Sequence, residues 1–382
     1  MKTKTLLTAA ALCSTMLATA QQVSVNVETA GTLKDQLNLE LTVSGKMDKT
    51  DFNFIDAFAG FKGLDMSAAT IEAYAPEGGT AYAANEIPDS AFMTSHYQNQ
   101  NDVTVYTGTK SIAKFVLPAS ITAIGASAFN SSAATTVDFS ACKALTTIKD
   151  HAFDLCGMEQ IDLSGLTALK TIETYAFDQT HASAISLEDC SQLEELTNNV
   201  FSQSYFCTSL NFKGCTALKT IGNRAFLNLG KYMGDGKNGV EQTEAELDLT
   251  PCTALETIDV SAFQSMKFTS VKFPASLKSI GEKAFNLASK ILTITFEGTV
   301  PPSLGPTAFT NKIMADATVY VPAGSEEAYK AAGFGNVQTI TAVASARAEA
   351  AAAEETSYDV QGHVATDATR GIVVSKSRKV VK

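Results

Sequence analysis

Tryptophan is absent from this 382-residue chain, and histidine occurs only four times. The histidines stand in unrelated contexts, without the His-Glu-x-x-His pair typical of zinc proteases. No Gly-x-Ser-x-Gly segment, which would place a nucleophilic serine on a sharp turn, occurs either. We therefore expect a protein that is not an enzyme and that has no catalytic, metal-binding or cofactor-binding residues. The four positions are His96, His151, His181 and His363.

Positive charge and long apolar runs are also scarce. The chain has 29 Lys and Arg against 40 Asp and Glu, a net charge of −11, and loss of Lys2 and Lys4 with residues 1–20 makes it −13 (−11 − 2). Such a chain is poorly suited to nucleic acid or anionic lipid, because both are bound mainly through Lys and Arg. Beyond the N-terminus, no segment approaches the roughly 18 apolar residues of a membrane span. The sequence predicts no nucleic-acid partner and no membrane span.

The N-terminus has the pattern of an export signal over residues 1–20. Lys2 and Lys4 precede an apolar stretch at 6–17, and Ala18-Thr19-Ala20 forms a small-residue cleavage site. A lipid anchor on the cysteine of this stretch is disfavoured, because Leu12 stands before it where a small residue is preferred. We therefore expect the protein to be secreted or held at the outer cell surface.

One pattern dominates the rest of the chain: Ile or Leu, four residues, then Phe, usually with Ala before the Phe. It occurs nine times, and successive Phe residues are 37, 24, 24, 24, 25, 37, 22 and 24 positions apart. A fixed period of this length is typical of repeat proteins. The repeated residues are Phe92, Phe129, Phe153, Phe177, Phe201, Phe226, Phe263, Phe285 and Phe309.

A second cluster precedes the Phe motif and alternates apolar, polar, apolar. This alternation predicts a short strand with one buried face. One coil buries too little apolar surface to fold alone, so the coils must stack. The sequence thus predicts a repeat solenoid: about nine coils of roughly 24 residues, with short parallel strands on one side and irregular turns on the convex side. The triplets lie at 137–139, 161–163, 185–187, 210–212, 247–249, 271–273 and 294–296.

Segments 117–129 and 277–285 resemble the BspA-like leucine-rich repeat, and residues 318–330 resemble the closing unit of that family. The resemblance covers about residues 60–340. It implies a leucine-rich-repeat stack in a secreted or surface protein of Bacteroides-type bacteria. Proteins of this family are often credited with adhesion to host proteins or other cells. The resemblance brings no catalytic residues with it.

Five segments are expected. Residues 1–20 form the signal, 21–60 an N-terminal cap, 61–340 the repeat domain, 341–357 an Ala/Glu-rich linker and 358–382 a short C-terminal tail. The tail resembles those of exported proteins in the same bacteria, some of which direct type IX secretion, although it departs from their common form at its histidine. A sorting role and a small strand pair without one both remain open.

Two coils are longer than the others by 13 residues (37 − 24), near 95–110 and 229–244. We expect surface hairpins there, with binding loops as the alternative. The second insertion contains a Gly-x-Gly-x-x-Gly segment at 234–239. A dinucleotide site needs a strand before that segment and a helix after it, and here it leads toward a repeat strand, so we expect a glycine-rich turn.

Six cysteines follow the export signal. An even number in an exported chain suggests disulfides. However, four of them stand three residues before the repeat Leu, where each coil needs a small buried group, and free cysteine behaves as one. We expect buried thiols at Cys142, Cys190, Cys215 and Cys252, whereas Cys156 and Cys207 lie outside this register.

The exposed face of the strands is the best candidate for function. It is flat, polar and without aromatic residues at the positions considered. The leading hypothesis is adhesion or binding of an extracellular protein from host matrix or another cell surface, with glycan or cation binding as the alternative. The third alternative is that the face is only solvated and binds no partner. The candidate residues are Asp138, Asp162, Gln160, Ser186, Asn211, Asp248 and Lys272, with Asp138 and Asp162 expected at the same register in neighbouring coils.

Overall fold

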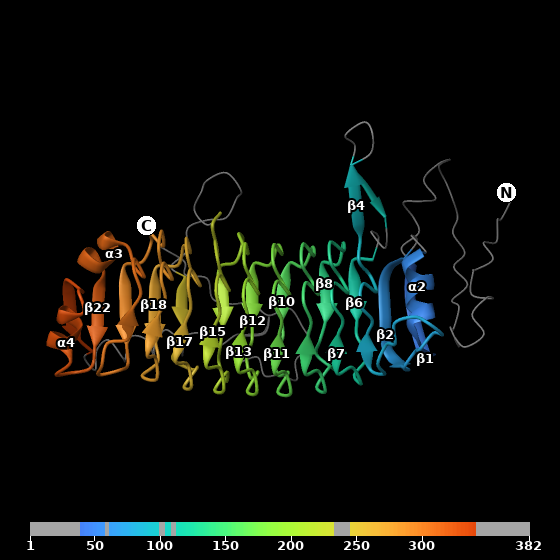
Figure 1. Ribbon diagram of the computed structural model, residues 1–382, viewed down its shortest axis with the longest axis horizontal. Coiled ribbons are helices and arrows are strands. Elements are labelled where there is room, and N and C mark those ends of the chain that lie inside the picture. The colour runs from blue at the N-terminus through green and yellow to red at the C-terminus, as the bar shows by residue number, and fades with distance from the viewer. Residues whose placement is uncertain (1–38, 58–60, 99–103, 108–111, 233–244, 341–382) are drawn as a thin grey trace, which may run out of the picture.

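The computed structural model describes residues 39–57, 61–98, 104–107, 112–232 and 245–340. In this part of the chain, coils stack into one elongated solenoid, with α2 (Lys49–Ala57) near one end and α4 (Glu326–Ala331) near the other (Figure 1). The predicted export signal, linker and tail lie outside the described residues. So does the glycine-rich segment 234–239.

The predicted triplets form parallel strands on one side of the stack, which we call the first ladder. Its strands belong to three consecutive sheets. The first sheet contains β1 (Leu39–Met47), β2 (Phe61–Ile71), β6 (Lys114–Val116) and β8 (Thr136–Asp138). The second contains β10 (Gln160–Asp162), β12 (Ala184–Ser186) and β14 (Ser209–Asn211). The third contains β16 (Glu246–Asp248), β18 (Ser270–Phe273), β20 (Thr293–Phe296), β22 (Thr318–Val321) and β23 (Asn336–Thr339).

A second ladder of nine two-residue parallel strands lies where the sequence predicted only irregular turns. The Ile or Leu that opens each Phe motif is the buried residue of these strands in all but the last, where it is half-buried. Nine strands agree with the predicted number of coils. The strands are β3 (Glu86–Ile87), β7 (Ala123–Ile124), β9 (Thr147–Ile148), β11 (Thr171–Ile172), β13 (Glu195–Leu196), β15 (Thr220–Ile221), β17 (Thr257–Ile258), β19 (Ser279–Ile280) and β21 (Ser303–Leu304).

The turn around each Phe is also tied to the next coil by backbone hydrogen bonds. The N–H groups of Ser127, Phe129 and Ser131 donate to carbonyl oxygens of the following coil, at 2.9, 2.7 and 2.8 Å. Ser127 and Ser131 have φ of 54° and 56°, and the matching positions of later coils repeat the positive φ. Non-glycine residues rarely adopt this conformation. The coil-to-coil hydrogen bonds hold it in place.

The core is a column of phenylalanine rings along the solenoid axis, as predicted. From Phe129 to Phe309, neighbouring rings of the repeat are stacked, with centroids 4.8–5.3 Å apart and interplanar angles of 4–13°. Phe92 continues the column at 5.1 Å from Phe129, with a tilt of 35°. All nine repeat Phe residues are buried.

The two ends and the first insertion depart from the regular coil. In α2, Phe52 and Ile55 are buried. At the other end, α3 (Asn311–Asp316) and α4 follow the last regular coil, and the hydroxyl of the buried Tyr329 donates to the Gly298 carbonyl at 2.8 Å. The first insertion forms the expected hairpin from β4 (Ser95–Gln98) and β5 (Thr104–Thr107), which projects from the stack (Figure 1).

All six cysteines of the repeat domain are buried and free. The prediction of buried thiols is therefore confirmed, and Cys156 and Cys207 follow the same rule. The thiol of Cys190 donates to the Leu163 carbonyl at 3.3 Å, and that of Cys215 to the Leu187 carbonyl at 3.0 Å, each in the preceding coil. Parallel side chains in successive coils thus bond to the backbone rather than to one another.

Candidate binding surface

The predicted polar residues do face outward from the first ladder, and most of them align. Asp162, Ser186 and Asn211 are register partners across β10, β12 and β14. Asp248 and Lys272 are partners across β16 and β18. The alignment then continues to residues 295 and 320, so the far end of this face does present an aromatic side chain, a tyrosine.

Asp138 and Asp162 keep the expected register, but the strands that carry them do not pair. The Glu159 N–H donates to the Thr135 carbonyl at 3.2 Å, as the Ser183 N–H donates to the Glu159 carbonyl one coil later. Asp138 lies on β8, the last strand of the first sheet, and Asp162 lies on β10, the first strand of the second. Like charges directly opposite one another destabilise a ladder, so an interruption here is favourable. The first ladder is interrupted twice, and both times the residue directly after the strand changes from Phe to Leu. Phe139 is followed by Leu163 in the next coil, and Phe212 is followed by Leu249.

The identity of the outward residues has a local cause that the sequence analysis missed. The Oδ1 atoms of Asp138, Asp162 and Asp248 each accept the backbone N–H two residues later, at 2.8, 3.0 and 2.9 Å. Asn211 accepts the Lys213 N–H in the same way at 3.0 Å. These are Asx turns, which reverse the chain after a strand. The recurrent Asp-x-Ser/Thr spacing is the signal that could have revealed them.

In the middle of the ladder, polar groups are paired with each other. Glu188, which the sequence analysis did not single out, accepts from Lys213 at 2.5 Å and from the Asn211 amide at 3.0 Å. The hydrogen bond from Lys213 lowers the pKa of Glu188. Further along, Lys272 forms an ion pair with Glu246 at 2.9 Å. This part of the face therefore has few unpaired charges to offer a partner.

The junction of the first two sheets, formed by β8 and β10, is different. We call it the acidic end, because it is the N-terminal end of the row of candidate residues. Asp138, Gln160 and Asp162 are exposed. Among the three-residue strands of the first ladder, β8 and β10 are the ones whose first and last residues are both exposed. Neither Asp138 nor Asp162 has an ion pair with another described residue. Beyond the Oδ1 used in its Asx turn, each carboxylate keeps a second oxygen free of described protein partners.

The repeat geometry is matched by one family. The model described as the BspA type leucine-rich repeat region matches residues 102–232 and 248–341 in six copies. The chain belongs to the BspA-type leucine-rich-repeat family. That range contains every candidate residue of the first ladder.

Similar solved structures are also bacterial, and no curated protein matches the chain. A leucine-rich repeat protein from Bacteroides ovatus has 12% identity over 86% of this chain and 76% of its own, with a TM-score of 0.42. The pneumococcal vaccine antigen PcpA has 18% identity over 79% and 94%, with a TM-score of 0.25. A leucine-rich cell surface protein from Faecalibacterium prausnitzii has 13% identity over 81% and 93%, with a TM-score of 0.16. Likenesses this distant say nothing of what this chain binds.

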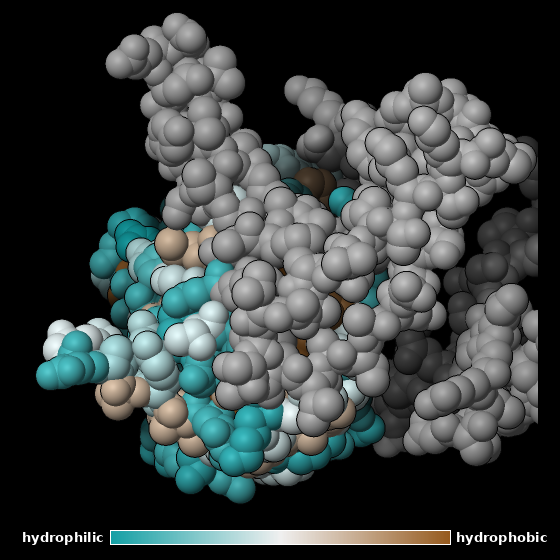
Figure 2. Space-filling view, turned by 90° about the vertical axis from the view of Figure 1, so that its right-hand side faces the viewer, coloured by the Kyte–Doolittle hydropathy of each residue, from teal (hydrophilic) through white to brown (hydrophobic). Residues whose placement is uncertain are grey.

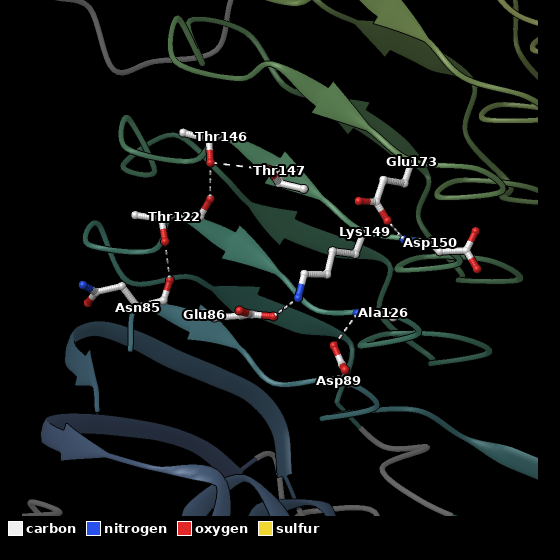
Figure 3. Close-up of polar contacts among 10 residues, drawn as sticks. All are labelled: Asn85, Glu86, Asp89, Thr122, Ala126, Thr146, Thr147, Lys149, Asp150 and Glu173. Carbon is white, nitrogen blue, oxygen red and sulfur yellow. Dashed lines mark hydrogen bonds and ion pairs between the residues drawn. The ribbon is translucent and has the colours of Figure 1, made fainter. Parts of the chain in front are cut away.

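The second ladder of this BspA-type stack is occupied with coil-to-coil contacts (Figure 3). The hydroxyl of Thr146 donates to the Thr122 carbonyl at 3.0 Å, and Thr122 donates to the Asn85 carbonyl at 3.2 Å. Lys149 reaches Glu86, two coils away, at 2.5 Å. Partial burial alone would lower the pKa of Lys149, but its hydrogen bond and ion pair with Glu86 outweigh that effect and raise it.

Charges further along the second ladder alternate between successive coils. Lys219 pairs with Glu194 at 2.7 Å, and Lys278 pairs with Glu256 at 2.7 Å. Such exposed pairs contribute little stability each, but the four charges in them are already matched. This face of the BspA-type stack therefore offers a partner less than the acidic end does.

Where the described residues are visible in a view from the N-terminal end, their surface is mostly hydrophilic, with hydrophobic residues in small separate spots (Figure 2). Among the described residues, no group of three or more His, Cys, Asp and Glu side chains could hold a metal ion. No helix in that same part of the chain is long and apolar enough to cross a membrane.

Proposed function

We propose that this BspA-type protein is a non-catalytic binding protein, secreted or held at the outer cell surface, that binds an extracellular protein through its acidic end. The observation that carries the proposal is the exposure of Asp138 and Asp162, each with a carboxylate oxygen free of described partners, beside the exposed Gln160. The export signal pattern at residues 1–20 supports the location.

The chemistry of the acidic end favours a partner with Lys or Arg side chains. The strand backbone and the Asx turns fix both aspartates, so little side-chain entropy is lost when a cation binds. Charge complementarity of this kind speeds association and makes it sensitive to salt. An adhesion role fits such a surface, since a rigid repeat stack offers an extended platform to a large partner.

Glycan or cation binding by the same face has less support. The acidic end presents no aromatic ring on which a sugar could stack. A calcium ion takes six to eight oxygen ligands, and no cluster of three acidic or other metal-ligating side chains lies within the described residues.

The test is a double charge reversal, Asp138→Lys with Asp162→Lys. Binding of the exported chain to immobilised extracellular-matrix proteins and to whole bacterial cells should be lost, and an oligolysine peptide should compete with the unmodified protein. The matched control, Glu77→Lys with Glu327→Lys, makes the same change in net charge at exposed sites away from the acidic end and should bind normally. Equal binding by both double variants, with unchanged circular dichroism, would refute the acidic end as the binding surface.

A further inference from the structure

A second surface, with the opposite charge, lies beside the second insertion. It consists of three aromatic residues and three lysines from neighbouring coils, and we call it the basic aromatic patch. Its members are Tyr205, Phe206, Lys231, Tyr232, Lys267 and Lys290, all half-buried or exposed.

The aromatic part is built by one extra residue. The Phe201 coil has 25 residues rather than 24. Ser183 and Thr208 nevertheless hold equivalent positions, because the N–H of each donates to a carbonyl oxygen of the preceding coil at 2.9 Å. The extra residue, Tyr205, therefore bulges outward with Phe206. The Tyr232 N–H donates to the Tyr205 carbonyl at 3.0 Å and brings the next coil alongside.

The rings pack against each other at the surface. The centroid of Tyr232 lies 4.9 Å from that of Tyr205 and 5.2 Å from that of Phe206. Interplanar angles of 47° and 63° leave the rings tilted rather than stacked. All three are half-buried, so part of each ring faces solvent. Aromatic side chains held in this way offer apolar contact area together with hydroxyl groups.

The lysines continue from this cluster along the stack. Lys231 Nζ lies 5.2 Å from the centroid of the Tyr205 ring. Burial, together with the charges of Lys290 and Lys231, lowers the pKa of Lys267, so Lys267 lies near both of the other ammonium groups. None of them forms an ion pair within the described residues, whereas Lys213, on the first ladder, pairs with glutamate.

This concentration of positive charge is notable in a chain with a net charge of −11. Like charges gathered without counter-charges destabilise a fold unless solvent or a ligand compensates them. An anionic ligand would gain from all three lysines at once. The tilted rings at one end of the row would hold the apolar part of the same ligand.

The spacing of the lysines indicates which kind of anion fits. Lys231, Lys267 and Lys290 come from three successive coils, which rise by about 4.8 Å each in a parallel ladder. That rise is close to the length of one sugar ring along an extended polysaccharide. An extended peptide, by contrast, presents side chains on one side only every ~6.6 Å. Lysine also suits carboxylate and sulfate groups as a point charge, while protein interfaces favour Arg over Lys.

We propose that the basic aromatic patch binds a linear acidic polysaccharide, one that carries carboxylate or sulfate groups on its sugar rings, laid along the solenoid axis. Sugar rings stack on Tyr205, Phe206 and Tyr232, and the anionic groups meet the lysines of successive coils. This site is separate from the acidic end and does not depend on it.

The test uses the exported chain with heparin, which carries sulfate and carboxylate, and with polygalacturonate, which carries one carboxylate on every ring and no sulfate. Neutral dextran serves as the negative control and oligoglutamate as the acidic-peptide competitor. Titration calorimetry should show binding to at least one acidic polysaccharide, weakening as salt rises, and none to dextran. Binding to heparin alone would assign the site to sulfated sugars, and binding to both would show that carboxylate suffices.

Variants separate charge from stacking. Lys231→Gln with Lys290→Gln should weaken binding by about tenfold per lysine and reduce the salt dependence. The matched control, Lys213→Gln with Lys278→Gln, removes two exposed lysines that pair with glutamates on the ladders and should bind as the unmodified chain does. Tyr232→Ala should weaken binding while leaving the salt dependence unchanged. Thermal melts establish that each variant is folded.

Three outcomes would overturn the proposal: no binding to either acidic polysaccharide, equal binding by the folded lysine variants, or tighter binding of oligoglutamate than of the polysaccharides. The last would assign the patch to acidic protein segments. This test is independent of the test of the proposed function, because the protein with Asp138→Lys and Asp162→Lys should keep its polysaccharide binding.

Discussion

Replacing Phe177 with alanine tests the structural basis of the whole stack. The ring is fully buried and lies between Phe153, at 5.0 Å and 4°, and Phe201, at 5.3 Å and 12°. Truncation of a buried Phe to Ala costs about 3–5 kcal/mol, and less when neighbouring groups collapse into the cavity. Here collapse is opposed by hydrogen bonds to the next coil from both ladders and from the Phe turn. We therefore expect a loss of about 4–5 kcal/mol, which includes two ring contacts of about 0.5–1.5 kcal/mol each.

Urea unfolding measures this loss. Far-ultraviolet circular dichroism reports the ladders, and tyrosine fluorescence is a usable second probe because the chain has no tryptophan. Coincident transitions and an unchanged m value are needed, since repeat arrays can lose cooperativity. The control is Leu287→Ala, a side chain that is 56% exposed, which should change stability by less than about 0.5 kcal/mol. A loss below about 1 kcal/mol for Phe177→Ala would refute the continuous column.

Two further predictions concern buried titratable groups. Burial raises the pKa of the Cys190 thiol to about 12 and also raises that of Cys215, so neither should be alkylated in the native protein, while both should react after denaturation. Mass spectrometry without reductant that found the two linked would contradict this. Burial raises the pKa of Asp178, and the charge of Asp154 adds to the effect. The ionised carboxylate therefore destabilises the fold above its raised pKa, and this penalty disappears as the pH falls below the ordinary value of about 3.9. Asp178→Asn, which copies Asn130 at the same register, should raise Tm at neutral pH and leave it unchanged in acid; an unchanged Tm at neutral pH would refute the assignment.

Much of the fold was predictable because the repeat is local. A buried Phe every 24 residues or so, and a three-residue alternation before it, each depend on side chains a few positions apart. A coil that cannot bury these residues alone must stack, whatever its neighbours are. The nine coils, the Phe column, the parallel first ladder and the buried thiols follow from that reasoning. The orientation of Asp162, Ser186 and Asn211 toward solvent follows from it as well.

The second ladder was missed because two residues are too few to reveal a period. Thr147–Ile148 and most of its equivalents contain one half-buried and one buried residue, which any turn could also show. Their identity as strands depends on hydrogen bonds to coils about 24 residues away. The Asx turns were missed for a different reason. A polar residue at the end of a strand is compatible with binding a partner and with forming a turn, and the sequence does not distinguish the two roles.

The repeated residues specify the coil: its length, its inward side chains and the need to stack. Which outward residues from different coils become neighbours depends on the folded stack. It interrupted the first ladder between the strands of Asp138 and Asp162, which keep the same register in neighbouring coils. It gathered Lys231, Lys267 and Lys290, which lie 36 and 23 residues apart, into one row. Inward positions are fixed by local hydrophobic period, whereas surface neighbours depend on the exact length and twist of every coil between them.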